Sequence, residues 1–229
     1  MEASTPRKVK PYKGVAMEGV IATWYAKNTA SSLAEFVDLA KRIAAETPAG
    51  AAVLEIAPGP GYLAIELARL GARRIAGLDI SHSFVRIASQ NAARAGVDID
   101  FRQGDAAALP FGAAAFDFIV SRAAFKNFGD PVGALREMHR VLRPGGTAVI
   151  FDMRGDATNA SIAKEVAKMR LGRASAFFTD AALRSLKKRA YSREDFVGMI
   201  AATPFGAGQI AEEPIGFEVR LTKAPGAAH

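Results

Sequence analysis

The sequence predicts an α/β fold: a doubly wound, mostly parallel seven-stranded sheet with helices on both faces and an antiparallel hairpin at the C-terminus. Two observations support this prediction. Between residues 51 and 153, short apolar segments alternate with segments of about 10–15 residues that have helical periodicity, as in strand–helix–strand units. Near the C-terminus, two further short segments flank the tight-turn sequence EEPIG, as in a hairpin that would close the sheet.

The elements before residue 154 follow in a regular order. We expect strands at 51–57, 74–80, 98–105, 116–124 and 147–153. We expect helices at 31–45, 62–71, 83–95 and 132–142. Gly71 and Gly96 each close one of these helices, because glycine readily adopts the left-handed conformation that ends a helix.

The alternation stops after residue 153. Residues 156–190 are expected to be helical throughout. Ser192 and Asp195 have the spacing of a capping box, which predicts another helix running to about Ala202. The last two strands are expected in FGAGQIAEEP and IGFEVRLTK, on either side of the turn.

Composition excludes several classes of protein. The 229 residues include no cysteine, so disulfides, thiolate metal sites and a cysteine nucleophile are ruled out. No apolar stretch approaches the roughly 18–20 residues that span a bilayer. The N-terminal sequence MEASTPRKVKPYKG lacks the apolar region of a secretory signal. We therefore expect a soluble, cytoplasmic protein without a transmembrane segment.

The net charge of +7 is concentrated in one segment. Residues 154–193 carry ten basic and three acidic side chains, whereas residues 14–153 carry fourteen of each. Such a basic segment attracts nucleic acid, anionic lipid or an acidic small substrate, or it forms a solvated helical face. These alternatives stay open at the level of sequence.

The stretch VLEIAPGPGYLAIELARLG, residues 53–71, reads as strand, glycine loop and helix. Three ligands suit such a unit: a P-loop phosphate, a dinucleotide and S-adenosylmethionine. No GK[ST] follows the glycines, which removes the P-loop. The dinucleotide is a real alternative, because Gly59, Gly61 and Ala64 match G-x-G-x-x-G/A and Asp79 lies twenty residues after Gly59.

Three features favour S-adenosylmethionine. Glu55 ends the strand just before the loop, so we expect its carboxylate to point into the mouth of the site, where it suits a cationic ligand better than a pyrophosphate. Pro58 and Pro60 lack the backbone N–H groups that a phosphate needs. Asp105 follows the third strand, where it can accept a hydrogen bond from an adenine amino group.

Over residues 50–153 the sequence resembles the class I S-adenosylmethionine-dependent methyltransferases, and within them the ubiquinone/menaquinone C-methyltransferase-like (methyltransferase type 11) branch. EIAPGPG matches the first motif of that family, with Ala57 in place of its first glycine. GLDIS, GDAAALPF, FDFIVSRAAFKNF and REMHRVLRPGG match the later ones. The resemblance implies a Rossmann-like methyltransferase fold, with S-adenosyl-L-methionine as cofactor and S-adenosyl-L-homocysteine as product.

The resemblance also implies a set of cofactor contacts. Glu55 and the loop at 57–61 would face the methionine part, and Asp79 would bind the ribose hydroxyls. Asp105 and the Ala106 backbone would read the adenine edge. The full set of expected cofactor-binding residues is Tyr25, Glu55, Ala57, Gly59, Gly61, Asp79, Ile80, Asp105, Ala106 and Ser121. Tyr25 enters because the N-terminal arm of related enzymes folds over the cofactor.

Methyl transfer is an in-line displacement in which the enzyme mainly positions the acceptor, so no catalytic residue and no metal is assigned. Residues that contact the acceptor should project from the ends of the fourth and fifth strands and from the insertion. The candidates are Arg122, Phe125, Lys126, Asn127, Arg154 and Phe178. The three cations would bind an anionic group, or would instead form salt bridges with Asp130, Asp152 or Asp156.

We therefore expect a methyltransferase acting on a small, aromatic or anionic metabolite. The alternatives are an RNA methyltransferase, a quinone-type lipid C-methyltransferase and a non-catalytic S-adenosylmethionine-binding protein. RNA is supported only by the basic segment, and a homodimer is left open. One domain is expected to cover residues 1–229. Its parts are an N-terminal arm and helix (1–48), a cofactor-binding core (49–154), a helical lid (155–191), and a final helix and hairpin (192–229).

Overall fold

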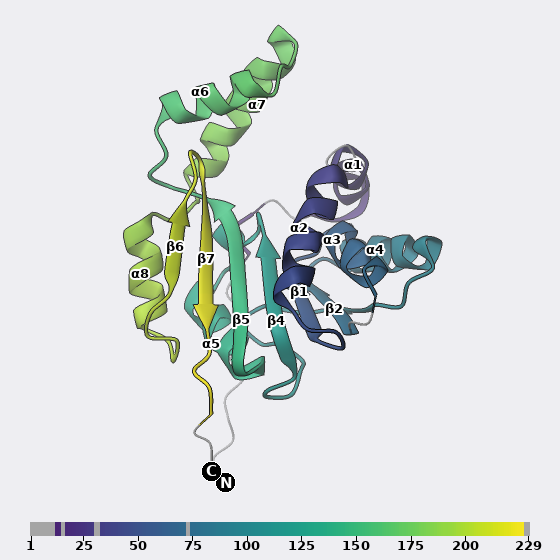
Figure 1. The fold of residues 1–229 in the computed structure, drawn as a ribbon. Helices are drawn as coiled ribbons and strands as arrows, with labels where there is room; N and C mark the ends of the chain where they lie inside the picture. The colour runs from purple at the N-terminus through teal and green to yellow at the C-terminus, as the bar shows by residue number, and fades with distance from the viewer. Residues whose placement is uncertain (1–11, 15–16, 30–32, 72–73, 227–229) are drawn as a thin grey trace.

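The computed structural model describes residues 12–14, 17–29, 33–71 and 74–226. Within these residues, a seven-stranded sheet has the order β3-β2-β1-β4-β5-β7-β6. All neighbouring strands are parallel except at β7, which is antiparallel to both β5 and β6 (Figure 1). The predicted fold class is confirmed, including the C-terminal antiparallel hairpin.

The strands lie close to their expected positions. They are β1 (Ala52–Ile56), β2 (Arg74–Asp79), β3 (Asp100–Gln103), β4 (Phe116–Arg122), β5 (Leu142–Met153), β6 (Gln209–Glu212) and β7 (Gly216–Thr222). The main difference is the early start of β5, which was expected at residue 147. Leu142 already pairs with Phe116, and the register then shifts before Phe118 pairs with Thr147. An irregularity of this kind leaves little trace in a hydrophobic pattern.

The helices surround the sheet. They are α1 (Gly19–Thr29), α2 (Leu33–Glu46), α3 (Tyr62–Arg69), α4 (His82–Ala95), α5 (Pro131–Val141), α6 (Asn159–Lys168), α7 (Arg173–Lys187) and α8 (Arg193–Ala201), with a short 3-10 turn at Phe125–Asn127. Helix α1 was not predicted, because it buries only Ala22 and Ala26 and so has no clear apolar stripe. The continuous helix expected at 156–190 is instead two helices separated at residues 169–172.

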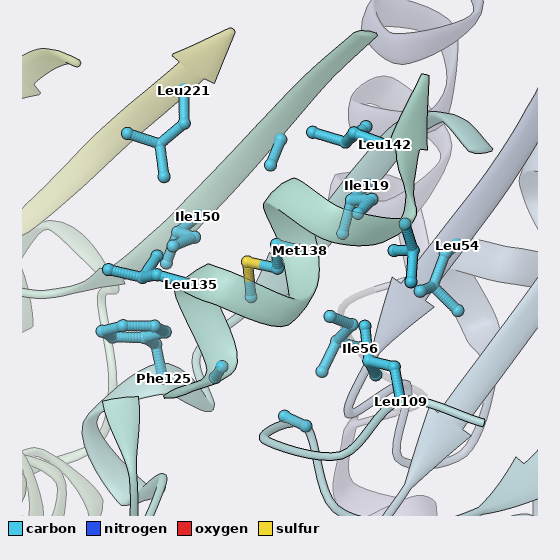
Figure 2. Close-up of a cluster of buried hydrophobic side chains, with 14 of the residues drawn as sticks. Leu54, Ile56, Leu109, Ile119, Phe125, Leu135, Met138, Leu142, Ile150 and Leu221 are labelled. Carbon is cyan, nitrogen blue, oxygen red and sulfur yellow. The ribbon is translucent and has the colours of Figure 1, made fainter. Parts of the chain in front are cut away.

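Two hydrophobic clusters cover the two faces of the sheet. Alternate residues of β1 point to opposite sides: Val53 packs with α2 and α3, and Leu54 packs with α5 and α8. Figure 2 shows the cluster that contains Leu54, in which Met138 and Leu135 of α5 lie among strand side chains such as Ile150. Strands buried on both faces explain the nearly continuous apolar runs seen in the sequence.

Local signals set several helix starts. The Ser81 side chain accepts from the backbone N–H of Phe84 and caps α4, and the Asp130 side chain caps α5. At α8 the capping box of Ser192 and Asp195 is present in both directions, as predicted. These caps place the helix N-termini at the edge of the sheet where the parallel strands end.

Helices α6 and α7 form an antiparallel pair that projects beyond the carboxyl edge of the sheet, and α1 lies at the same end (Figure 1). The side chains of Phe177 and Phe178 on α7 are 70% and 69% exposed. Among the described residues, no helix is long and apolar enough to cross a membrane.

Candidate cofactor and acceptor site

A cavity of about 630 Å³ lies where the strand order reverses between β1 and β4, at the carboxyl ends of the strands. This is the usual ligand position in a doubly wound sheet. Its walls come from β1, β2 and β4 with their following loops, from α1 and the residues before it, and from the end of the insertion. The predicted residues that line it are Tyr25, Ala57, Gly59, Asp79, Ile80, Asp105, Ala106, Arg122, Lys126 and Asn127.

Three alternate residues of the glycine loop have left-handed backbone conformations. Ala57, Gly59 and Gly61 have φ values of 59°, 54° and 80°. A Cβ on Gly61 would come within 2.9 Å of the Phe101 ring and 3.0 Å of the Ala88 Cβ, so this glycine is required for packing as well as conformation. Ala57 replaces the glycine of the family motif at a position whose backbone still favours glycine.

Asp79 connects this loop to the end of β2. Its Oδ2 accepts from the Gly59 backbone N–H at 3.0 Å, and its Oδ1 accepts from the Ser81 backbone N–H at 2.9 Å. Burial raises the pKa of Asp79 to about 6, and these two hydrogen bonds oppose that rise. Each carboxylate oxygen keeps an acceptor site, and the residue lines the cavity, so its position fits a ligand that presents two neighbouring hydroxyls.

Glu55 has a different position from the one we expected. Its carboxylate does not line the cavity among the described residues but lies beneath the first turn of α3, where Oε2 accepts from the Ala64 backbone N–H at 2.9 Å. The residue is 3% exposed, and burial raises its pKa to about 8. The expectation that this carboxylate points into the mouth is therefore wrong, because the α3 N-terminus offers it a buried donor.

The residues that were predicted to contact adenine lie together at the cavity. Ile80, Asp105 and Ala106 all line the cavity. Asp105 Oδ1 accepts from the Ala107 backbone N–H at 2.9 Å, which leaves its second oxygen for a ligand. The Gly104 backbone N–H donates to the Asp79 carbonyl at 2.9 Å and holds the two acidic loops side by side.

The segment before α1 closes this side of the cavity. The Glu18 carboxylate accepts from the backbone N–H groups of His82 and Ser83, both at 3.0 Å, so it binds the N-terminus of α4. The ring of Tyr25 packs edge-to-face on Phe84 with centroids 5.7 Å apart. Tyr25 and Trp24 therefore form a wall of the cavity.

Several predicted acceptor residues already have partners. Arg122 lines the cavity, but its guanidinium pairs with Glu35 at 2.6 Å. Lys126 Nζ pairs with Asp152 Oδ1 at 2.8 Å, which is the salt-bridge alternative considered for this residue. Asn127 also lines the cavity and its side chain is hydrogen-bonded to Tyr12, while its Oδ1 has no hydrogen-bond partner among the described residues.

The other candidates lie elsewhere in the described structure. Phe125 is fully buried and stacks on Phe196 with centroids 5.3 Å apart. Arg154 pairs with Asp156 at 2.7 Å and covers the ring of Phe217, away from the cavity. Phe178 is exposed on α7, and none of these three residues lines the cavity. Ser121 is buried at the end of β4 beside the cavity without lining it, and its Oγ has no hydrogen-bond partner in the part of the chain that the structure describes.

Several residues of the cavity were not predicted, among them Arg189 and Tyr12. Arg189 lies just after α7, and Tyr12 belongs to the segment before α1. Burial is the main cause that raises the pKa of the Tyr12 phenol, and the charge of Asp79 adds to it. The excess of basic residues in the segment 154–193 pointed to this segment as a source of cations. It did not show that Arg189, among the ten cations of the segment, would face the cavity. No signal in the sequence distinguished Tyr12.

A segment of the chain matches a known protein family. Residues 54–150 match the family described as a methyltransferase domain. Over this segment the chain is similar to the class I S-adenosylmethionine-dependent methyltransferases, a similarity that implies S-adenosylmethionine as the methyl donor. The positions of Asp79, Asp105 and the glycine loop fit that cofactor.

Curated methyltransferases are similar to about half of this chain. The chain is 38% identical over 101 residues to a demethylmenaquinone methyltransferase of Thermus thermophilus, covering 44% of this chain and 46% of the relative. It is 39% identical over 117 residues to a 2-phytyl-1,4-naphtoquinone methyltransferase of Thermosynechococcus vestitus, covering 50% and 52%. The match thus spans about half the length of these curated relatives. Over this segment the chain is similar to quinone C-methyltransferases.

Solved structures agree with the fold. A structure from Methanococcus maripaludis, assigned to the S-adenosylmethionine-dependent methyltransferases, superposes with a TM-score of 0.72 over 91% of this chain and 94% of that one. The two sequences are 22% identical, so this likeness concerns the fold alone.

Proposed function

We propose that this protein transfers a methyl group from S-adenosylmethionine to a small aromatic or anionic metabolite. The observation that carries the proposal is a single cavity lined by acidic, aromatic and basic residues. In the reaction the methyl–sulfur bond breaks as the bond to the acceptor forms, the sulfonium becomes the neutral thioether of S-adenosylhomocysteine, and the acceptor loses a proton to solvent.

The acidic residues of the cavity would bind and orient the cofactor. Asp79 would accept from the ribose hydroxyls, and Asp105 from the adenine amino group. Gly59 has open space where a side chain would be, so its backbone permits close approach of a ligand. The proposed contributions of Glu55, Gly61 and Ser121 are indirect, because these residues shape the loop and strand ends without lining the cavity.

Apolar residues of the same cavity suit a flat acceptor next to the cofactor. Trp24, Tyr25, Phe84 and Phe128 line the cavity, and Leu186 adds an aliphatic surface from the insertion. Such a wall excludes water and holds a planar ring in one orientation, which is the main requirement of an in-line displacement. No acid is needed for the leaving group, which departs as a neutral thioether.

The proposal is tested by incubating the protein with methyl-labelled S-adenosylmethionine and a cell extract, and separating small molecules, lipids and RNA. Label in water-soluble small molecules supports the proposal, and label in RNA contradicts it. Cofactor binding without any transfer would instead indicate a non-catalytic binding protein. Calorimetry with S-adenosylhomocysteine tests the cofactor site separately, and we expect Asp79→Asn to weaken binding by about tenfold or more, because a charged acceptor is lost.

A quinone-type lipid is the second candidate acceptor. In addition to the names of the relatives, one structural observation favours it. Among the exposed large hydrophobic residues, most lie on α1, at the turn between α6 and α7 or in the first half of α7, at the carboxyl end of the sheet. They are Val20, Ile21, Trp24, Tyr25, Met169, Leu171, Phe177 and Phe178. An apolar rim of this kind suits an acceptor with a long apolar tail. Label recovered in the organic-solvent fraction of the same experiment would favour this candidate over a water-soluble metabolite.

A further inference from the structure

Three segments that are far apart in the sequence meet at the cavity. Tyr12 comes from the segment before α1, Asn127 from the loop after β4, and Arg189 from the residues after α7, and all three line the cavity. Lys13 joins them, because its backbone N–H donates to the Asn127 carbonyl at 3.0 Å and its Nζ donates to the Tyr191 hydroxyl at 2.7 Å. The three side chains are therefore held together by tertiary contacts.

Two of these side chains have buried polar atoms without partners. Arg189 Nε and Asn127 Oδ1 make no hydrogen bond among the described residues. Buried polar groups are nearly always paired, so an unpaired one needs an explanation, and a ligand in the cavity supplies it. One atom is a charged donor and the other is a neutral acceptor. A ligand satisfying both must offer an acceptor oxygen and an O–H or N–H donor.

The positive charge of Arg189 is also available to bind a ligand. Of the other cations that line the cavity, Arg122 pairs with Glu35 and Lys126 pairs with Asp152. Arg189 forms no ion pair with any residue that the structure describes. Tyr12 does not neutralise it, because the raised pKa keeps the phenol protonated at neutral pH. A guanidinium free of carboxylate partners in a partly desolvated cavity favours an anionic ligand.

We propose that Tyr12, Asn127 and Arg189 form the recognition subsite for the methyl acceptor, and that this acceptor is an aromatic anion with a hydroxyl group next to its ionised oxygen. Arg189 Nε donates to the ionised oxygen, Asn127 Oδ1 accepts from the neighbouring hydroxyl, and the Tyr12 hydroxyl lies beside both. The aromatic wall at Tyr25 and Phe128 holds the ring. This inference rests on the proposed methyltransferase function, and it assigns to the insertion a part in choosing the acceptor.

The subsite is tested by calorimetry on the protein saturated with S-adenosylhomocysteine. The probes are 1-hydroxy-2-naphthoate, its neutral analogue 1-hydroxy-2-naphthamide, and 2-naphthoate, which lacks the hydroxyl. We expect the hydroxynaphthoate to bind at least about tenfold more tightly than the amide, a difference of about 1.4 kcal/mol. Arg189→Met is expected to abolish this preference. Asn127→Ala is expected to weaken hydroxynaphthoate binding and leave 2-naphthoate binding unchanged.

Lys188→Met is the matched control, because it removes an adjacent exposed cation that does not line the cavity. It should keep the preference of the unmodified protein. Equal binding of the anion and the amide by the unmodified protein, or a preference that persists in Arg189→Met, would overturn the subsite.

The affinity of each variant for S-adenosylhomocysteine serves as the check on folding, and it should stay within about twofold of the unmodified protein. Failure of the unmodified protein to bind S-adenosylhomocysteine would contradict the proposed function itself. A normal cofactor affinity without anion preference would contradict only the subsite. If Arg189→Met does not fold, the comparison of the two probes on the unmodified protein decides the question alone.

Discussion

Lys126 and Asp152 form a buried ion pair that joins the loop after β4 to the end of β5. Lys126 Nζ lies 2.8 Å from Asp152 Oδ1, and the Lys126 backbone N–H donates to Asp152 Oδ2, also at 2.8 Å. The two side chains are only 5% and 2% exposed. Lys126 Nζ donates in addition to the Ala123 carbonyl. This pair holds the floor of the cavity beside Asn127, so we assign Lys126 a structural task rather than direct contact with the acceptor.

Replacing this lysine should destabilise the protein strongly. Lys126→Met leaves the Asp152 carboxylate buried without its cation, and we expect a loss of about 3–5 kcal/mol in the free energy of unfolding. Urea denaturation at pH 7 measures it. Lys168→Met is the control, because its pair with Glu165 has a lysine side chain that is 58% exposed, and it should cost about 1 kcal/mol or less. Similar small losses in both variants would show that the buried pair contributes little.

Ala57 is a site where glycine should stabilise the protein. Its φ of 59° places an L-residue in the left-handed region, which costs roughly 1–2 kcal/mol relative to ordinary conformations. Part of the gain from Ala57→Gly is offset by the greater freedom of glycine in the unfolded chain, so we expect a net increase of about 0.5–1 kcal/mol. The midpoint of urea denaturation should rise accordingly.

The control for Ala57→Gly is the same substitution at Ala93, which is exposed within helix α4. There the glycine should lower stability by about 0.5–1 kcal/mol. A loss of stability at both positions would mean that the Ala57 methyl group contributes more by packing than its backbone conformation costs.

The buried Glu55 should make stability depend on pH. Its pKa is raised from an ordinary value of 4.5 to about 8, so between these values the folded protein binds a proton that the unfolded chain has released. The free energy of unfolding must therefore fall as pH rises through this window, by up to about 1.4 kcal/mol per pH unit. Asp79, with a pKa of about 6, contributes in the same direction only at lower pH.

Glu55→Gln distinguishes the pH dependence caused by Glu55 from that caused by Asp79. Glutamine resembles the protonated acid and its oxygen still accepts from the Ala64 backbone N–H, so the variant should fold. Between pH 6.5 and 8 we expect its denaturation midpoint to stay nearly constant, while that of the unmodified protein falls. Parallel curves for the two proteins would assign the pH dependence to other groups.

Trp24 should report ligand binding. It is the single tryptophan of the chain, it lines the cavity, and its side chain is 64% exposed. A ligand that covers the indole moves it into a less polar environment, so saturation with S-adenosylhomocysteine should shift the emission to shorter wavelength. Trp24→Phe should lose the signal and retain binding by calorimetry. An emission spectrum that stays constant while calorimetry shows saturation would place the ligand away from α1.

The order of strands and helices from α2 to β5, the glycine loop and the acidic residues at the strand ends could be read from the sequence. These features are local: a buried strand, a glycine at a left-handed position or a capping serine has its own pattern over a few residues. The family resemblance added the cofactor, and the positions of Asp79 and Asp105 at the cavity agree with it.

Other features depended on which distant segments meet. Glu55 was expected in the cavity, but the buried N-terminus of α3 supplied a partner for its carboxylate. Arg154 and Phe125 follow strand ends, as the argument required, yet one pairs with Asp156 and the other packs in the core.

The sequence by itself therefore determined the fold class and the position of the acidic residues at the ends of the strands, because parallel strands bring their carboxyl ends to one edge. Only the tertiary structure decided which residues form the rest of the cavity. Tyr12 and Arg189 are 177 positions apart and reach the same cavity through packing of the arm and the insertion against the loop after β4. Contacts between such distant segments have no local pattern, since the free energy that forms them comes from burial across the whole domain.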